Sequence, residues 1–174
     1  AAQKYYCRSM SVTGTNGKTT TAELVERMMR LANRHTTKAG GSGQAVCSIA
    51  EQTRKLDFAT LEVSSFQLES IEHFRPSVAV LLNLKPDHMD RYDRMANYVK
   101  TVTRVFQNQQ VFDWAIIQSE AMAQIRSLDL PIPSTISTFS AVNRPAALAL
   151  DRGRLVSRLP GWTGPLLARD PVLV

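Results

Sequence analysis

The chain has 174 residues, of which 44% are hydrophobic and 21% charged, and its formal net charge is +6. This length suits one domain with a real core, and the chain has no apolar run long enough to span a bilayer. The basic residues are scattered singly, so the charge favours anionic small molecules over nucleic acid. Cys7 and Cys47 form neither a disulfide framework nor a metal-ligand spacing, and the first ten residues lack the order of a secretory signal. We therefore expect a cytoplasmic protein.

The N-terminal part predicts a strand, a glycine-rich loop and a helix. Residues 10–13 are β-prone and run into the loop GTNGKTT at residues 14–20. From Thr19 to about Asn33, apolar residues recur at helical spacing, with acidic residues early and basic residues late, as a helix dipole prefers. This order places the loop at the carboxyl end of a strand and at the start of a helix.

Three further strands are predicted at residues 58–63, 77–84 and 114–117, separated by segments of helical periodicity. Such alternation is typical of a parallel sheet with helices on both faces, so we expect an α/β fold. After residue 131 the run STISTF is β-prone, and LALDRGRLVSRL predicts a hairpin around residues 151–153. We expect one domain over 1–174, with an α/β nucleotide-binding core at 1–130 and a β-rich subdomain at 131–174.

The glycine loop has the composition of a phosphate-binding loop, although its spacing differs from the commonest pattern, which would need a glycine at Val12. A loop that enters a helix through Gly14 and Gly17 leaves backbone N–H groups free to bind phosphate. Lys18 would add a positive charge, and the Thr19 hydroxyl is placed to bind Mg²⁺. The structural alternative is a turn that only caps the helix, with Asn16 or Thr19 as the N-cap.

A second motif, EVSSFQLE at residues 62–69, begins where a predicted strand ends. Ligands of open α/β sheets bind at the carboxyl ends of the strands, so Glu62 can hold a cation beside the phosphate loop. In the structural alternative, Ser64 or Ser65 caps the next helix and Glu69 lies on its surface. The two interpretations are compatible, because a cap and a cation ligand need different residues.

A third motif, NLKPDHMDRY at residues 83–92, follows the buried strand at 77–84. A lone His88 in a loop is more often a surface residue than a ligand. The fold, however, would gather three strand ends at one edge of the sheet, and these ends carry Lys18 with Thr19, Glu62, and Asp87 with His88. We therefore predict a shared site there.

The segments VTGTNGKTTT, LEVSSFQLES and NLKPDHMDRY, in this order and at these distances, resemble the central ATP-binding domain of the Mur ligases. The resemblance covers roughly residues 10–120, and SSFQLE and DHMDRY are most similar to the branch that adds D-glutamate to UDP-N-acetylmuramoyl-L-alanine. It implies a ligase of peptidoglycan synthesis that uses ATP and Mg²⁺. ATP would phosphorylate the carboxylate of the UDP-linked muramoyl substrate, and the amine of D-glutamate would attack the acyl phosphate.

The resemblance also implies residue roles. Lys18 would stabilise charge on the transferring phosphoryl group, while Thr19 and Glu62 would hold one Mg²⁺. His88 would ligate a second Mg²⁺ near the acceptor carboxylate. Ser64, Gln67 and Ser42 would lie on the muramoyl side of the site. The residues expected to bind ATP are Gly14, Thr15, Asn16, Gly17, Lys18, Thr19 and Thr20.

The sequence departs from the family pattern at two positions. The family carries a carbamate-modified lysine on the helix after the third motif, and Val102 stands at that position and can only pack. Lys100 lies about 200° around the helix and cannot replace it. Ser42 stands where the family has a substrate-binding asparagine.

The family's N-terminal UDP-binding domain and C-terminal domain have no counterpart in these residues. We therefore expect that this polypeptide does not complete the reaction alone and acts together with those domains of a ligase. The alternative is a noncatalytic nucleotide-binding module derived from a Mur ligase.

Overall fold

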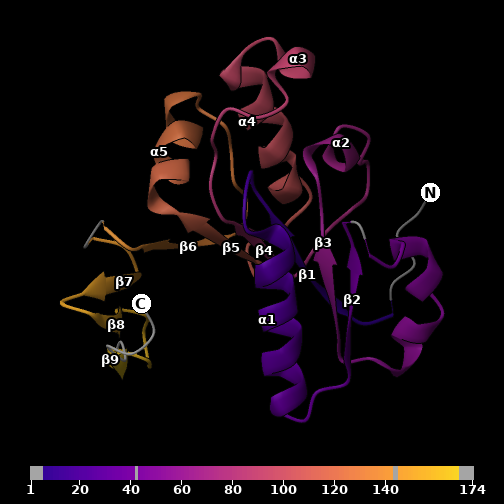
Figure 1. Ribbon diagram of the computed structural model, residues 1–174, viewed down its shortest axis with the longest axis horizontal. Coiled ribbons are helices and arrows are strands. Elements are labelled where there is room, and N and C mark those ends of the chain that lie inside the picture. The colour runs from indigo at the N-terminus through magenta and orange to yellow at the C-terminus, as the bar shows by residue number, and fades with distance from the viewer. Residues whose placement is uncertain (1–5, 42, 143–144, 169–174) are drawn as a thin grey trace.

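The computed structural model describes residues 6–41, 43–142 and 145–168. In these residues nine strands form one sheet in the order β2-β3-β1-β4-β5-β6-β7-β8-β9 (Figure 1). The strands are β1 (Arg8–Thr13), β2 (Thr36–Gly40), β3 (Phe58–Glu62), β4 (Val78–Leu81), β5 (Trp114–Gln118), β6 (Thr135–Ser140), β7 (Leu148–Asp151), β8 (Arg154–Ser157) and β9 (Gly164–Ala168).

The helices connect the strands along the chain. The α-helices are α1 (Lys18–Leu31), α2 (Ser65–Leu68), α3 (Met89–Tyr92), α4 (Met95–Thr103) and α5 (Ser119–Ser127), and the 3₁₀ helices are η1 (Val46–Ile49), η2 (Gln52–Lys55) and η3 (Arg104–Phe106). Among the described residues, none of these helices has both the length and the apolar character needed to cross a membrane.

The pairing confirms the predicted fold class. In the order of the sheet, the strands from β2 through β3, β1, β4, β5 and β6 to β7 pair in parallel. Strand β8 pairs antiparallel with both β7 and β9. The predicted hairpin is present, because Asp151 pairs with Arg154 across a turn whose two residues, Arg152 and Gly153, both have positive φ. Strand β6 pairs in parallel with β5, so the parallel sheet continues past residue 131, and antiparallel pairing starts only at β7.

Two strands of the structure differ from the prediction. The expected strand at 77–84 ends at Leu81, because the chain then turns to contact the glycine loop. Strand β2 was not predicted, since its sequence TTKAG has no run of apolar residues. It is an edge strand, and Glu26 of α1 accepts a hydrogen bond from the Lys38 N–H at 3.0 Å.

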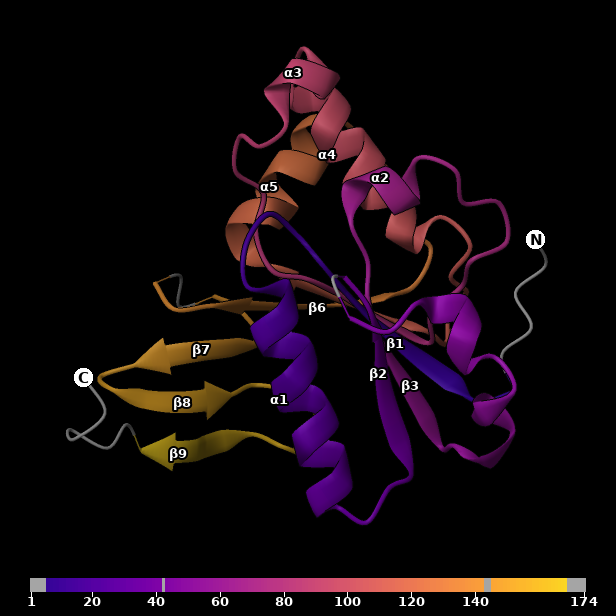
Figure 2. The same ribbon diagram turned by 45° about the vertical axis from the view of Figure 1, so that its right-hand side comes forward.

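The helices cover the two faces of the sheet unequally. Helix α1 packs on β1, β2 and β3, on the face that carries Val12, Lys38 and Glu62, which we call the α1 face. Helix α5 packs on β5 and β6 and against α4, which in turn contacts α2 and α3. Figure 2 shows α2 to α5 gathered together, with α1 apart from them. The opposite face, called the core face, carries the buried residues Ala59, Leu61, Ala79, Leu81, Ala115 and Ile117.

A buried amide joins three strands near their amino ends. The Gln109 side chain donates to the carbonyls of Pro76 at 2.9 Å and Trp114 at 3.2 Å, and it accepts from the Ser134 hydroxyl at 2.7 Å. Gln109 is 1% exposed, so water cannot replace these partners. The residue therefore fixes the starts of β4, β5 and β6 relative to one another.

We expect Gln109→Leu to destabilise the protein by roughly 2–4 kcal/mol, because it leaves buried carbonyl and hydroxyl groups without partners. Gln110→Leu is the matched control, since Gln110 is exposed. Urea unfolding of the two variants measures the difference, and equal midpoints would show that the network contributes nothing.

Candidate functional site

Three strand ends meet at the carboxyl edge of the sheet. Strand β1 lies between β3 and β4, and Val12 pairs with Glu62 while Thr13 pairs with Leu81. The loop after β1, the carboxylate at the end of β3 and the segment after β4 therefore start side by side. This is the edge at which ligands bind in open α/β sheets.

The glycine loop presents an uncapped helix end. Gly17 is the N-cap of α1 with φ 88°, and no side chain caps the helix, so the alternative with Asn16 or Thr19 as the cap is wrong. The first N–H groups of α1 consequently lack partners within the helix. Gly14 has φ 129°, and a Cβ there would lie 3.0 Å from the Asn83 carbonyl oxygen, so only glycine fits.

The segment after β4 holds the loop in place. Asn83 and Asn16 exchange two hydrogen bonds, because the Asn83 amide oxygen accepts from the Asn16 N–H at 2.9 Å and its Nδ2 donates to the Asn16 carbonyl at 3.0 Å. The Thr15 N–H also donates to the Asn83 carbonyl at 3.1 Å. The loop shape thus depends on a residue that the sequence analysis did not single out.

The Thr15 hydroxyl is bonded on two sides. It accepts from the Lys85 N–H at 2.9 Å and donates to the Lys85 carbonyl at 3.1 Å. The Tyr98 hydroxyl of α4 lies 3.0 Å from the same oxygen. Burial raises the pKa of Tyr98, so its phenol stays a neutral hydrogen-bonding group. Thr15 is therefore a structural anchor whose side chain faces into the protein.

Thr19 and Glu62 meet directly. The Thr19 hydroxyl donates to Glu62 Oε1 at 3.0 Å, and Glu62 is only 6% exposed. A Cβ on Gly41, whose φ is 60°, would lie 2.5 Å from the carboxyl carbon of Glu62. The glycine turn after β2 therefore leaves the space that this carboxylate occupies. The Lys18 ammonium folds back over the loop and donates to the carbonyls of Gly14 and Thr15, each at 2.9 Å.

His88 lies on the segment after β4. It is the N-cap of α3, with φ 51°, and its ring packs on Phe66 with the centroids 4.6 Å apart. Its Nε2 lies 3.5 Å from Asp87 Oδ2. In the described part of the chain no three His, Cys, Asp or Glu side chains are grouped to hold a metal ion, so His88 does not join Glu62 in such a group.

The remaining predicted site residues have diverse positions. Ser64 and Gln67 form a capping box at the start of α2, with Gln67 Oε1 accepting from the Ser64 N–H at 2.9 Å, so the predicted cap is present. Thr20 is exposed on the first turn of α1. Ser42 lies outside the described residues.

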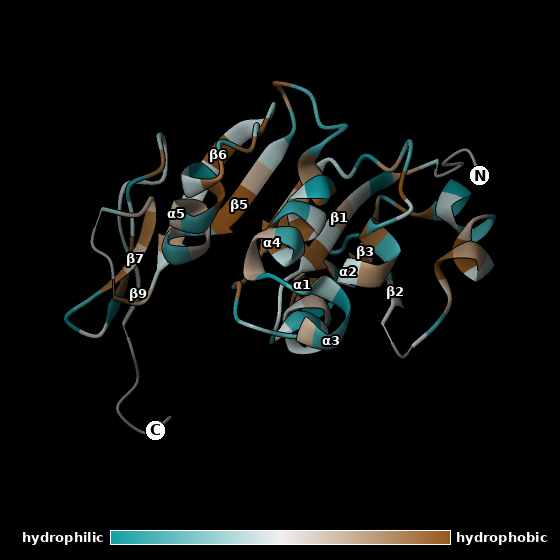
Figure 3. Ribbon diagram, turned by 90° about the horizontal axis from the view of Figure 1, so that it is seen from above, coloured by the Kyte–Doolittle hydropathy of each residue, from teal (hydrophilic) through white to brown (hydrophobic). Residues whose placement is uncertain are grey.

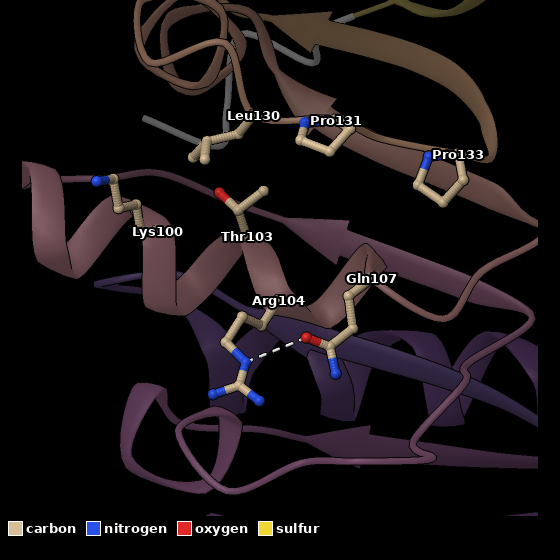
Figure 4. A pocket seen from close by; sticks show the side chains of 7 residues that line it. All are labelled: Lys100, Thr103, Arg104, Gln107, Leu130, Pro131 and Pro133. Carbon is tan, nitrogen blue, oxygen red and sulfur yellow. Dashed lines mark hydrogen bonds between the residues drawn. The ribbon is translucent and has the colours of Figure 1, made fainter.

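Val102, the residue that the resemblance aligns with the family's lysine, is 1% exposed and packs in the core. Lys100 instead lines a hollow of about 360 Å³ between α4 and residues 130–133 (Figure 4).

An ion-pair cluster joins the second and third motifs. Arg91 donates to both carboxylate oxygens of Glu69, and the Tyr92 hydroxyl donates to Oε1 at 2.7 Å. Arg91 also lies over the Phe66 ring, 5.3 Å from its centroid. The hydrogen bonds from Arg91, and next from Tyr92, lower the pKa of Glu69 to about 2. The cluster holds α2 against α3 and so positions the segment that carries His88.

Comparison with known proteins identifies the family. The sequence pattern of the Mur ligase middle domain matches residues 12–151. The chain belongs to the Mur ligase family. It is 36% identical over 166 residues to UDP-N-acetylmuramoylalanine-D-glutamate ligase of Alkaliphilus oremlandii, covering 95% of this chain and 36% of that relative. The ligase of the same name from Pelotomaculum thermopropionicum is 42% identical over 118 residues, which cover 67% of this chain and 26% of that relative.

Solved Mur ligases share the fold. UDP-N-acetylmuramoyl-L-alanyl-D-glutamate-2,6-diaminopimelate ligase superposes with a TM-score of 0.68 at 23% identity, over 94% of this chain and 39% of that one. MurF ligase from Thermotoga maritima in complex with ADP gives a TM-score of 0.68 at 17% identity, over 88% and 38%. The chain thus spans about a third of the length of these relatives.

Acid should loosen the contact between α2 and α3. Because the pKa of Glu69 is lowered from 4.5 to about 2, its stabilising effect is complete above about pH 4.5 and is lost as the pH falls toward 2. Glu69→Gln should therefore destabilise the protein at pH 6 and have a smaller effect at pH 3. Thermal unfolding of the variant and of the unchanged protein at the two pH values checks this. An equal drop in melting temperature at pH 6 and at pH 3 would contradict it.

Proposed function

We propose that this chain is the nucleotide-binding middle part of an ATP-dependent ligase that adds D-glutamate to UDP-N-acetylmuramoyl-L-alanine in peptidoglycan synthesis. The observation that carries the proposal is the position of Lys18 and Thr19 on an uncapped helix end, with Thr19 bonded to Glu62 at the carboxyl end of β3. The names of the D-glutamate ligase relatives support the substrate, and the ADP complex of MurF supports the nucleotide.

The loop fits the phosphates of ATP. The free N–H groups at the start of α1 and the positive end of its dipole favour an anion. Lys18 would exchange the carbonyls of Gly14 and Thr15 for phosphate oxygens, because a phosphate carries more negative charge than a carbonyl. The backbone N–H groups would then orient the nucleotide, while Asn83 keeps the loop in shape.

The adjacent oxygens fit Mg²⁺. Thr19 Oγ1 and Glu62 Oε1 are hard oxygen donors 3.0 Å apart, and both would turn from each other to a shared cation. When bound, Mg²⁺ would neutralise charge on the phosphates during transfer to the substrate carboxylate. The roles of His88 at a second cation and of Ser64, Gln67 and Ser42 at the muramoyl substrate stay predictions, as does the cytoplasmic location.

A second candidate function is a nucleotide-binding module that does not ligate. The burial of Val102 favours it, because an apolar side chain stands where the family has a carbamate-modified lysine. The module would bind Mg·ATP through the same loop, so nucleotide binding alone cannot separate the two candidates. Turnover with both substrates does.

The full-length protein that contains this chain should release ADP and phosphate only with UDP-N-acetylmuramoyl-L-alanine and D-glutamate both present. Lys18→Ala should abolish this release, whereas Lys55→Ala, at an exposed position in η2, should not change it. Mg·ATP binding without substrate-dependent release would contradict the ligase and favour the module.

The glycine after β2 should be required for cation binding. Gly41→Ala would push the Glu62 carboxylate away from Thr19 and weaken Mg·ATP binding by roughly tenfold or more. Gly43→Ala is the control, because a Cβ there meets its nearest atom at an ordinary 3.5 Å. Calorimetric titration of the full-length variants measures both affinities, and equal values would show that Glu62 does not hold the cation.

A further inference from the structure

The hollow beside α4 has the size of a small-molecule site. Its volume is about 360 Å³, and it lies between α4 with η3 on one side and residues 130–133 on the other (Figure 4). None of the residues that line it is among those expected to bind the nucleotide, the cation or the muramoyl substrate. Pockets that bind small molecules have volumes of roughly 300–1,000 Å³, so this hollow is large enough for one small ligand.

The first wall of the hollow is one side of the helical segment formed by α4 and η3. Lys100, Thr103, Arg104 and Gln107 recur along it at i, i+3, i+4 and i+7, which is the spacing of one helix side. The other side of the segment is buried in the core and carries Val99, Val102, Val105 and Phe106. Figure 3 shows hydrophilic and hydrophobic residues together on α4. Core packing therefore holds this wall in place without a ligand.

The second wall begins at a fixed helix end. Asp129 has φ 50°, the Leu130 N–H donates to the Ile125 carbonyl at 3.3 Å, and the Asp129 N–H donates to the Arg126 carbonyl at 3.1 Å. These two bonds are those of a Schellman motif, which ends α5. Leu130 then packs against the core while part of its surface lines the hollow.

Two prolines stiffen the rest of the second wall. Pro131 and Pro133 each have a restricted φ angle and no backbone N–H. Ser134 follows them directly and donates its hydroxyl to the buried Gln109 amide at 2.7 Å. The hollow thus lies between two walls that are already fixed, so a ligand would not have to order either of them.

Arg104 brings positive charge to the hollow without a carboxylate to balance it. Its guanidinium donates to the carbonyls of Glu69 and Ile71 and to Gln107 Oε1, the last at 3.1 Å, and all three acceptors are neutral oxygens. Figure 4 shows the guanidinium joined to Gln107 and turned away from Leu130. The fixed charge of Arg104 therefore acts on the hollow from its edge.

Lys100 is the cation that can contact a ligand. It lies one helical turn before Arg104, is exposed, and forms no hydrogen bond or ion pair within the part of the chain that the structure describes. Asp129 on the opposite wall does not pair with it there either. Like charges four residues apart on a helix repel each other, so an anion beside Lys100 would also relieve its repulsion by Arg104.

These features together select the class of ligand. Leu130, Pro131 and Pro133 offer apolar surface, and none of them has an unpaired backbone N–H for an anion. A phosphate group needs several donors, whereas a carboxylate can be held by one cation. We propose that the hollow binds a small organic carboxylate, with its apolar body against Leu130, Pro131 and Pro133 and its carboxylate on Lys100.

Binding of two matched probes to the full-length protein that contains this chain tests the proposal. The probe 3-phenylpropionate has a ring and a carboxylate, and 3-phenylpropionamide has the same shape without the charge. In saturation-transfer NMR titrations without nucleotide, we expect the acid to bind about tenfold or more tightly than the amide. Lys100→Met should remove this difference, because it keeps an apolar stem and deletes the charge, whereas Lys100→Arg should preserve it.

Lys55→Met is the matched control, since Lys55 is an exposed lysine in η2, and it should leave both affinities unchanged. Gln107→Trp should weaken the binding of both probes, because the indole would fill the hollow. Unchanged affinities in Gln107→Trp would place the apolar body elsewhere and contradict the proposal.

Three further results would overturn the proposal. The first is equal binding of acid and amide, or binding of neither. The second is an equal loss in Lys55→Met and Lys100→Met, which would show a general attraction to surface charge. The third is binding that Lys18→Ala abolishes and Lys100→Met leaves intact, because the probe would then occupy the glycine loop.

Discussion

Strand β1 is paired on both sides by parallel neighbours, β3 and β4. Its last residue, Thr13, pairs with Leu81 at the end of β4, and the preceding residue, Val12, pairs with Glu62 at the end of β3. This pairing determines where the loop starts and which groups it meets. The reciprocal bonds between Asn83 and Asn16 then fix the loop, and the loop starts α1 with its N–H groups uncapped. A displacement of β1 would therefore move both Lys18 and the Thr19 hydroxyl away from the Glu62 carboxylate.

The site combines rigid and adjustable parts. Thr15 and Asn83 are held by several hydrogen bonds and keep the backbone of the loop in one shape. Within the described part of the chain, the side chains of Lys18, Thr19 and Glu62 bond to the loop or to each other, so they can exchange partners without a change of backbone. This division suits a phosphate site, because the backbone donors are preorganised while the charged groups adapt to the ligand.

The sequence was sufficient for the α/β class, the glycine loop, a serine cap at the start of α2 and the hairpin at residues 151–153, because each depends on short-range chemistry. It left open whether Ser64 or Ser65 is the cap, and it did not reveal the reciprocal bond from the Ser64 N–H to Gln67. It did not reveal β2, whose TTKAG segment is fixed by pairing with β3 rather than by its own pattern. Asn83 and Tyr98 were missed because their contacts with residues 15 and 16 are distant in sequence. The packing of His88 on Phe66 was missed as well, because it depends on how two separate loops pack together.

We propose that nucleotide phosphates bind the loop at residues 14–20 beside Glu62. Amide hydrogen exchange of the full-length protein, with and without Mg·ATP, measures this most directly, because bound phosphate protects the N–H groups that it accepts from. We expect slower exchange at Gly17, Lys18 and Thr19 when Mg·ATP is bound, with no change in the hairpin of β7 and β8. Unchanged exchange in the loop, or protection confined to another part of the chain, would contradict it.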